Sequence, residues 1–305
     1  MPETSVIITN WNGKQWLPTC LAALTQQTYR DFEIIFVDDG STDGSAAWVV
    51  EHYPQVRLIE QKPHVGFAAA NNIGIKAARG KYIVTLNNDT QPDENFLQAL
   101  VTGIIAPDVG MVAAQMRLWD APQLLDSAGI TVDWAGFGWN RGFGQPVAAW
   151  ETPQEVFGPC AGAALYRREM LDEIGLFDED FYAYYEDVDL AWRARRAGWR
   201  CRYTPEAWVL HKHSATGRKF NRKKIFLLNR NRLWTIIKNY AAVDFLWVLP
   251  LIVFGDFLSL VKQLWQTKSP VPLRARWSAM LGAGKMWRKR GRGRRVRLAW
   301  RRVGW

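Results

Sequence analysis

Short runs of apolar residues alternate with polar turns along the first third of the chain. Three segments repeat apolar positions at helical spacing, at residues 17–27, 45–53 and 66–78. Between them lie four runs with the length and β-branched content of buried strands, at residues 5–9, 32–37, 56–60 and 82–86. This alternation predicts an α/β fold with a doubly wound, mostly parallel, Rossmann-like sheet.

Polar residues directly follow three of these strands. Thr9-Asn10 closes the first, Asp38-Asp39 the second and Asn87-Asn88-Asp89 the fourth. Parallel strands point the same way, so these ends should meet at one edge of the sheet, where ligands bind in open α/β folds. A carboxylate beside carboxamides can hold a hard divalent cation and nucleotide oxygens. An Asx-rich turn that only ends the strand is the alternative.

The pattern continues less regularly beyond residue 92. Residues 93–116 predict a helix and a strand, and 156–166 a turn and a strand whose small residues let a ligand approach. The Gly- and Trp-rich residues 118–154 fit either an acceptor-binding loop or a packed excursion. Further on, we expect helices at 167–175 and 190–197, the second preceded by Glu186-Asp187-Val188-Asp189, and short strands at 199–203 and 207–210. Helix capping is the alternative role for that acidic group.

The charge is distributed unevenly. Residues 1–217 hold 17 Lys and Arg against 27 Asp and Glu, whereas residues 218–305 hold 22 basic residues against two acids. Two halves of opposite sign suggest two roles. The three scattered cysteines indicate no disulfide framework or zinc site and fit a reducing compartment. No secretory signal is expected ahead of the first strand.

The basic half contains the most apolar stretch, residues 246–261. This stretch is shorter than the roughly 20 residues that a membrane span needs, and it contains Pro250 and Asp256. Eight basic residues and no acid occur at 218–238, and ten basic residues at 285–302. We therefore predict a helix lying on an anionic membrane surface. A solvated tail or an RNA-binding patch is the alternative, but no RRM, KH or OB signature is present, so no nucleic-acid partner is predicted.

Five motifs occur in order that together resemble the family 2 inverting glycosyltransferases of the GT-A fold, and most of all their bacterial rhamnosyltransferase-like members. They read VIITNWNG, VDDGSTDGS, GFAAANNIG, LNNDT and YEDVDL, at residues 6–13, 37–45, 66–74, 86–90 and 185–190. The resemblance implies a GT-A domain at 1–217, with nucleotide-binding (1–116) and acceptor-binding (117–217) parts. Residues 218–305 would form a helical, membrane-associating extension.

The resemblance also implies roles for individual residues. Asp187 would be the catalytic base, with Gly162 and Glu186 at the acceptor. Asp89 would bind a Mg²⁺ or Mn²⁺ ion together with His211, or with His213 in its place. An Asn stands at 87 where the family has its first Asp, which removes one negative charge from the metal site. The nucleotide would contact Thr9, Asn10, Asn12, Asp38 or Asp39, Asn71, Asn87 and Asn88.

These expectations combine into one predicted function. The chain would transfer a sugar, with dTDP-rhamnose as the suggested donor, to a hydroxyl of a lipid-linked glycan during cell-surface polysaccharide synthesis. It would work at the cytoplasmic face of the cell membrane as a peripheral protein. Two alternatives are a nucleotidyltransferase, which would need a Gly-rich triphosphate loop absent from residues 10–14, and a non-catalytic scaffold that binds membrane or nucleic acid.

Overall fold

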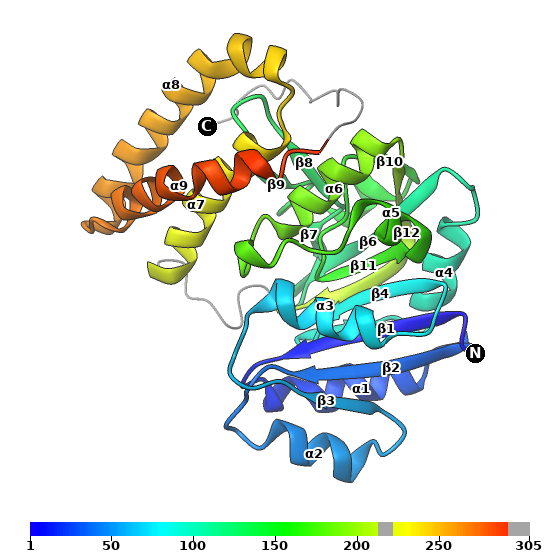
Figure 1. The fold of residues 1–305 in the computed structure, drawn as a ribbon. Helices are drawn as coiled ribbons and strands as arrows, with labels where there is room; N and C mark the ends of the chain where they lie inside the picture. Colours follow the sequence, from blue (N-terminus) through cyan, green and yellow to red (C-terminus); the bar gives the residue numbers. More distant parts are fainter. Residues whose placement is uncertain (213–221, 292–305) are drawn as a thin grey trace.

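The computed structural model describes residues 1–212 and 222–291, and a ten-stranded sheet forms its centre (Figure 1). Side chains alternate between its two faces: Val6 and Ile8 belong to one hydrophobic cluster and Ile7 to the other. One half of the sheet is parallel, in the order β4 (Tyr82–Asn87), β1 (Thr4–Asn10), β2 (Phe32–Asp38) and β3 (Arg57–Glu60). The four predicted strands and the α/β fold class are confirmed.

Helices cover both faces of this parallel half. On one face lie α1 (Leu17–Thr25) and α2 (Ser45–His52), and α4 (Phe96–Gly103) continues this layer over β12 (Arg200–His211) and β6 (Val109–Leu118); their buried side chains join the cluster of Val6. On the other face α3 (Phe67–Ala77) packs so closely on β1 that a Cβ at Gly74 would lie 2.4 Å from Ile7 Cγ2. The connections between strands therefore follow the predicted alternation.

The other half of the sheet mixes strand directions. There, β11 (Ala163–Arg167) runs antiparallel between β4 and β6, and β12 runs parallel to β6. The two short strands predicted at 199–203 and 207–210 are one strand, whose register shifts between Thr204 and Trp208. Pro205 lies at this irregularity, which is where a sheet accommodates a proline.

Residues 118–154 form a packed excursion rather than a loop that lacks regular structure. They contain β7 (Ala121–Ser127), which pairs with β6, and the hairpin of β8 (Ile130–Val132) and β9 (Gly138–Asn140). Leu125, Ile130 and Val132 are buried in the core. The remaining short strands are β5 (Thr90–Pro92) and β10 (Gln154–Val156), both paired with β12, and single 3-10 turns occupy Lys14–Trp16, Val147–Trp150 and Glu179–Phe181.

The acidic quartet of residues 186–189 lies inside a helix. After α5 (Arg168–Ile174), α6 (Glu186–Ala197) begins four residues earlier than predicted, so Glu186, Asp187 and Asp189 occupy its first turn. Carboxylates are favoured there by the partial positive charge of a helix N-terminus. None of the three accepts the hydrogen bond of an N-cap, because the N-cap position belongs to Tyr185.

Three helices follow in the basic half, as predicted for the C-terminal region. In Figure 1, α7 (Arg222–Asn239) and α9 (Val271–Arg288) cross beside α6, whereas α8 (Ala242–Thr267) extends away from the sheet. The described part of α8 is longer than the predicted 16-residue stretch. Its residues Trp247–Thr267 are long and apolar enough to cross a membrane by length and composition, and 11% of that window is buried inside the protein. The length argument against a crossing therefore no longer holds.

Candidate active site

The polar strand ends lie side by side at one edge of the parallel strands. The sheet register pairs Asn10 with Asp38 and Thr9 with Asn87. Asn10 joins its neighbours, because its Nδ2 donates to Asp38 Oδ1 at 3.1 Å and its Oδ1 accepts a hydrogen bond from Asn88 Nδ2 at 2.6 Å. Three motifs far apart in sequence thus form one connected polar edge.

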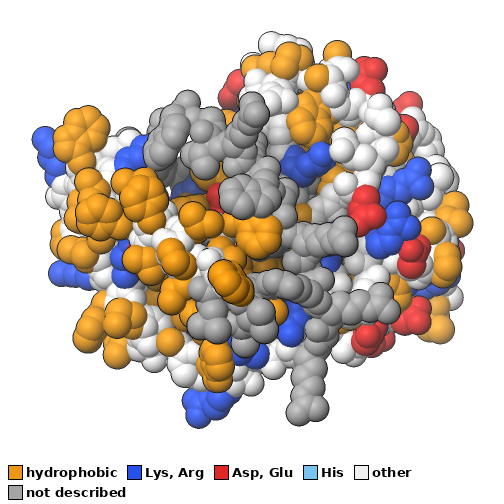
Figure 2. Space-filling model, turned by 90° about the horizontal axis from the view of Figure 1, so that it is seen from above, with side chains coloured by type: hydrophobic (Ala, Val, Ile, Leu, Met, Phe, Trp, Pro, Cys, Tyr) orange, Lys and Arg blue, Asp and Glu red, His pale blue; other side chains and the backbone are white. Residues whose placement is uncertain are grey.

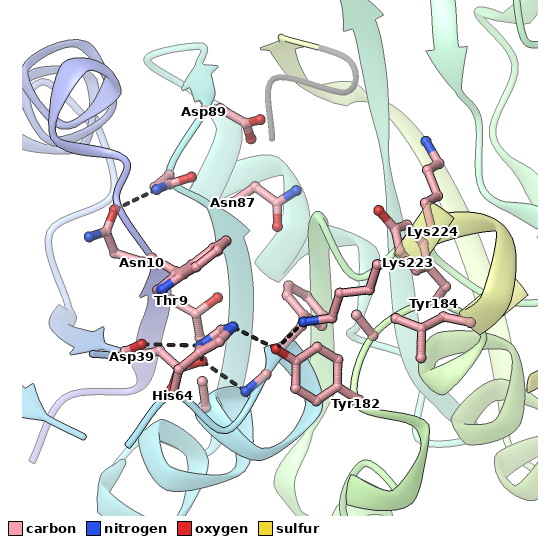
Figure 3. Close-up of a pocket in the computed structure, with 17 residues that line it drawn as sticks. Thr9, Asn10, Asp39, His64, Asn87, Asp89, Tyr182, Tyr184, Lys223 and Lys224 are labelled. Atoms are coloured by element: carbon pink, nitrogen blue, oxygen red, sulfur yellow. Dashed lines mark hydrogen bonds and ion pairs between the residues drawn. The ribbon is translucent and has the colours of Figure 1, made fainter. Parts of the chain in front are cut away.

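A pocket opens over this edge (Figure 3). It brings together six of the sequence-predicted residues: Thr9, Asn10, Asp39, Asn87, Asn88 and Asp89. Its other walls come from the loops after β1 and β3, the loop before α6 and the first turn of α7. These walls contribute Trp11, His64, Tyr182, Tyr184, Lys223 and Lys224.

A line of hydrogen bonds crosses the floor of the pocket. His64 Nδ1 lies 2.6 Å from Asp39 Oδ2, and His64 Nε2 lies 2.6 Å from the hydroxyl of Tyr182, which accepts a hydrogen bond from Lys223 Nζ at 2.7 Å. With Nδ1 donating to Asp39, Nε2 is left to accept from Tyr182. Trp11 stacks on His64 at a ring separation of 4.5 Å. The line ties the sheet edge to α7.

Three predicted nucleotide residues lie outside this pocket. Asp38 is buried and accepts a hydrogen bond from the backbone N–H of Ser41 at 3.0 Å, so it supports the loop after β2. Asn71 is buried in α3 and donates to Phe67 O at 2.9 Å. Asn12 is exposed, accepts from Thr42 N at 2.8 Å and lines a separate hollow. Of the pair Asp38 and Asp39, only Asp39 reaches the pocket.

Asp187 lies next to the pocket rather than in its lining. Its Oδ2 accepts a hydrogen bond from Ala161 N at 3.4 Å. Gly162, the residue after Ala161, accepts a hydrogen bond at its carbonyl oxygen from Asn87 N at 2.8 Å. The Cβ of any other residue at 162 would lie 3.0 Å from Asn87 Nδ2. Asp187 and Gly162 are therefore placed directly behind the Asn87 side of the pocket, with Glu186 adjacent in α6.

The two neighbouring carboxyls differ in their electrostatics. Burial raises the pKa of Glu186 well above its usual range, and the charge of Asp187 raises it further. Burial also raises the pKa of Asp187, but the backbone N–H groups of Val188 and Ala161 oppose that rise. Glu186 Oε2 is buried and has no hydrogen-bond partner among the described residues. The pair therefore favours a proton on Glu186 and a negative charge on Asp187.

Helix α7 holds the loop that leads to these carboxyls. Tyr182, Tyr184 and Tyr185 have φ angles of +66°, +67° and +70°, a region that costs a residue other than glycine roughly 1 kcal/mol or more. The buried Asn231 Nδ2 lies 2.7–2.9 Å from the carbonyl oxygens of residues 181, 183 and 184. The unusual backbone is thus fixed by a side chain from the basic half.

A second contact with α7 is made by Asp189 of α6. It is fully buried, and its Oδ2 accepts hydrogen bonds from Lys238 Nζ at 2.9 Å and from Arg193 Nε at 2.8 Å. Burial alone would raise the pKa of Asp189, but the charges of Arg193 and Lys238 and the hydrogen bond from Asn239 lower it to about 2. Asp189 is an ionised link between α6 and α7.

The predicted metal residues Asp89 and His211 face each other. His211 Nε2 lies 3.4 Å from Asp89 Oδ1, a buried oxygen that has no other polar partner among the described residues. His211 Nδ1 lies 2.5 Å from Asp126 Oδ2 of β7. Burial alone would lower the pKa of His211, but the hydrogen bonds and charges of Asp126 and Asp89 raise it to about 10.

Asp89 and His211 suit a cation that leaves other positions of its coordination shell to waters and substrate. No group of three or more His, Cys, Asp or Glu side chains with metal-site spacing occurs in residues 1–212 and 222–291. Once His211 gives up the proton on Nε2, as metal binding requires, its imidazole and the Asp89 carboxylate suit a divalent cation whose other ligands are waters and phosphates. The alternative ligand His213 lies outside the described residues.

Five residues around the site are absent from the sequence prediction: Trp11, His64, Asp126, Lys223 and Lys224. Trp11 lies between two predicted residues, so its position alone could have indicated it. Asp126 lies in the segment that lacked a clear periodicity. The two lysines reach the pocket from more than 130 residues beyond β4, and their charges belong to the run of basic residues attributed to the membrane.

Comparison with known proteins shows the family of this chain. The family described as Glycosyl transferase family 2 matches residues 5–175, more than half of the chain. Among curated proteins, an N-acetylglucosaminyl-diphospho-decaprenol L-rhamnosyltransferase of Mycobacterium tuberculosis is 29% identical over 240 residues, which cover 70% of this chain and 77% of the relative. The O-antigen biosynthesis protein RfbC of Myxococcus xanthus is 28% identical over 71% of this chain and 18% of its own length.

The same fold occurs among solved structures. A crystal structure of GalNAc-T7 with UDP, GalNAc and Mn²⁺ superposes with a TM-score of 0.63 at 17% identity, covering 78% of this chain and 48% of that one. At this level of identity the likeness supports the GT-A fold.

Proposed function

The chain belongs to glycosyl transferase family 2, and on that premise we propose that it moves a sugar, with inversion, from a nucleoside diphosphate sugar to a hydroxyl of a lipid-linked glycan. We propose dTDP-rhamnose as the donor, because the rhamnosyltransferase of M. tuberculosis aligns over most of the chain. That relative acts on N-acetylglucosaminyl-diphospho-decaprenol by its name, which motivates a lipid-linked acceptor here. Family membership favours this function over nucleotidyl transfer and over a non-catalytic scaffold.

The observation that carries the proposal is the polar edge of the sheet beneath one pocket. Asp39 at one end and Asp89 at the other leave a span between them for a nucleoside joined to a diphosphate. Asp187 lies behind Asn87, on the side from which an acceptor hydroxyl could approach the sugar. This separation of donor and base suits displacement on the face opposite the leaving group.

We propose that Asp187 is the base that removes the proton of the acceptor hydroxyl. An acceptor hydroxyl must lose its proton as it attacks the anomeric carbon, and a positioned carboxylate can take it. Two backbone N–H groups hold Asp187 in place, and its raised pKa improves its basicity. Glu186, favoured in its protonated form beside Asp187, can donate a hydrogen bond to the acceptor. Neighbouring carboxyls with different environments commonly divide acid and base roles in this way.

The experiment that tests this proposal is the conservative substitution Asp187→Asn. We expect turnover with sugar nucleotide and acceptor to fall about 10²- to 10⁴-fold, the usual range for loss of a general base, while nucleotide affinity measured by calorimetry stays near wild type. The matched control is Asp172→Asn, an exposed carboxylate on α5. Near-normal turnover in Asp187→Asn would contradict the assignment of the base.

We propose that Asp89 and His211 hold a divalent cation, Mg²⁺ or Mn²⁺. The buried Asp89 Oδ1, whose one described polar neighbour is His211 Nε2 at 3.4 Å, supports this assignment. When bound, such a cation would offset the negative charge that develops on the departing diphosphate. Asn87 offers a neutral amide oxygen at the position where related sequences have a carboxylate, so we expect weaker metal binding than a two-aspartate site would give.

Asp126 would position the metal ligand. Its hydrogen bond to His211 Nδ1 directs Nε2 toward Asp89, in the arrangement by which carboxylates orient metal-binding histidines. We expect Asp126→Asn to weaken Mn²⁺ binding about tenfold or more, measured by electron paramagnetic resonance titration in the presence of dTDP. Asp120→Asn, an exposed site just before the same strand, should bind Mn²⁺ like wild type. Equal affinities in the two variants would contradict a positioning role.

We also propose that α8 and α9 attach the enzyme to an anionic membrane surface. Thirteen of the 19 exposed large hydrophobic side chains in the described residues belong to these two helices, and Figure 2 shows them gathered on one side of the molecule. Asp256, in the middle of α8, pairs with Arg232 of α7 and Arg276 of α9. These pairs join the middle of α8 to α7 and α9, which favours an interfacial position over a crossing.

A further inference from the structure

Two consecutive lysines of the basic half belong to the pocket wall. Lys223 and Lys224 lie in the first turn of α7, and Figure 3 shows both on the side opposite Asn10 and Asp89. They are the only Lys or Arg residues among the described residues that line this pocket. We propose that Lys223 and Lys224 form a binding site for a diphosphate group, an inference that rests on the function proposed above.

The two ammonium groups are distributed along the length of the pocket. Lys223 Nζ donates to the Tyr182 hydroxyl at 2.7 Å and lies 4.1 Å from the centre of that ring, at the end of the line that begins at Asp39. Lys224 Nζ lies 5.6 Å from the centre of the Tyr184 ring. Burial lowers the pKa of Lys224, whereas the charge of the nearby Asp126 acts to raise it. The pair therefore faces the span between Asp39 and the Asp89–His211 group.

The placement of these lysines is fixed by the rest of α7. Asn231, two turns along the helix, holds the loop of residues 181–184 through three carbonyl oxygens, and Arg230 donates to the carbonyls of Asp180 and Phe181. Lys223 in turn contacts Tyr182 of the same loop. The first turn of α7 and the turn two turns further along it are thus both held against one loop at the pocket, and a site built there is preorganised.

The chemistry of the pocket requires positive charge at this place. A diphosphate carries several negative charges, and group transfer adds another to the leaving group; lysines are common partners of such groups. The sheet edge contributes Asp39 and Asp89, which are both negative, while Asn87 is neutral. Burial lowers the pKa of Lys224, and a bound anion would counter that effect. The opposite wall therefore contributes the complementary charge.

A diphosphate could come from either substrate. It is part of a nucleoside diphosphate donor, and it is also part of a prenyl diphosphate acceptor whose lipid would run toward the apolar helices. The experiment measures both, using dTDP with Mn²⁺ for the first and farnesyl diphosphate for the second, each by calorimetry. Thymidine, which has no phosphate, reports on the base and ribose alone.

The test compares the double variant Lys223→Gln/Lys224→Gln with Lys223→Arg/Lys224→Arg and with the control Lys81→Gln. Lys81 is exposed at the other end of β4, far from the pocket edge. We expect the Gln variant to lose about 10- to 100-fold in affinity for one diphosphate probe, with unchanged thymidine binding, as for lost charged hydrogen bonds. The Arg variant should keep most of the affinity, and Lys81→Gln all of it.

The arms of the experiment identify the source of the diphosphate. Loss confined to dTDP assigns the pair to the donor, and loss confined to farnesyl diphosphate assigns it to the acceptor. Wild-type affinity of the Gln variant for both probes would overturn the inference and leave the proposed transferase function intact. If the wild-type protein bound neither dTDP nor thymidine, the proposed function and this inference would both fail.

Discussion

Helices α7 and α8 are neighbours in the basic half, yet they present opposite kinds of surface. Helix α7 buries polar side chains, among them Asn231 and Lys238, against the loop before α6 and the first turn of α6. Helix α8 leaves large apolar side chains such as Phe254, Phe257 and Trp265 in contact with solvent. Part of the positive charge of this half is therefore buried in α7, whereas its large apolar side chains are exposed on α8.

Much of the basic charge is used inside the protein. Lys238 bonds to Asp178 and Asp189, Lys289 to Asp178 and Asp180, and Lys285 to Asp180. These carboxylates belong to the acidic half, so the opposite charges of the two halves hold them together around the loop before α6. The predicted domain boundary at 217/218 falls outside the described residues and stays a prediction.

The largest effect should come from removing a charge of α7. Lys238 is 4% exposed and lies between two carboxylates, so Lys238→Met leaves Asp178 and Asp189 with fewer partners in a buried site. We expect the free energy of unfolding to fall by about 3–5 kcal/mol, measured by urea denaturation. Lys262→Met, at an exposed site on α8, should change it by less than about 0.5 kcal/mol. Equal losses of free energy of unfolding in the two variants would contradict the difference between α7 and α8.

The apolar face of α8 should matter for a different measurement. Phe254 and Phe257 are 62% and 59% exposed. We expect Phe254→Ser/Phe257→Ser to reduce binding to vesicles containing phosphatidylglycerol about 100-fold, since each phenyl ring contributes roughly 1.5 kcal/mol on burial. Nucleotide affinity in vesicle-free buffer should not change. The control is Val50→Ser/Ile105→Ser, which changes exposed apolar side chains outside α8. If this control bound vesicles as weakly as the α8 variant, α8 would not be the specific membrane-binding surface.

Strong acid should weaken the buried ion pair that joins Asp189 of α6 to α7. The pKa of Asp189 is lowered to about 2 in the folded protein, below its ordinary value of 3.8. Its stabilisation is therefore complete above about pH 4 and is lost as the pH falls toward 2, a contribution of about 2 kcal/mol. Urea denaturation at a series of pH values should show this loss in wild type and a smaller one in Asp189→Asn. If the free energy of unfolding of Asp189→Asn fell with pH as steeply as that of wild type, Asp189 would not be the source of the acid sensitivity.

The sequence predicted the parallel half of the sheet well because each strand there carries its own signal. Buried runs such as residues 82–86 are continuous, and each polar end follows directly, so the edge with Asn10, Asp39 and Asp89 could be derived from local pattern. Residues 118–154 gave no such signal, because their short strands are interrupted by glycines and turns. Asp126 was missed for that reason.

The wall of the pocket made by α7 could not be derived in the same way. Lys223 and Lys224 reach the site through tertiary packing that no local periodicity encodes, and a basic run looks alike whether it faces lipid, phosphate or carboxylate. Asn231 illustrates the same limit, since its partners are backbone carbonyls of a loop nearly 50 residues earlier. Sequence pattern located the chemistry of the sheet but not the residues that enclose it.

The left-handed backbone of Tyr182, Tyr184 and Tyr185 has a practical consequence for anyone who wants this enzyme in a water-soluble form. A chain ended before Arg222 would keep Asp89, Asp187 and every strand, yet the segment that carries Asp187 would lose the amide that compensates its unfavourable φ angles. That segment would then relax to ordinary conformations and carry the carboxylate away from the pocket. Solubility is better sought by exchanging outward-facing side chains of α8 for polar ones, with the full complement of helices kept in place.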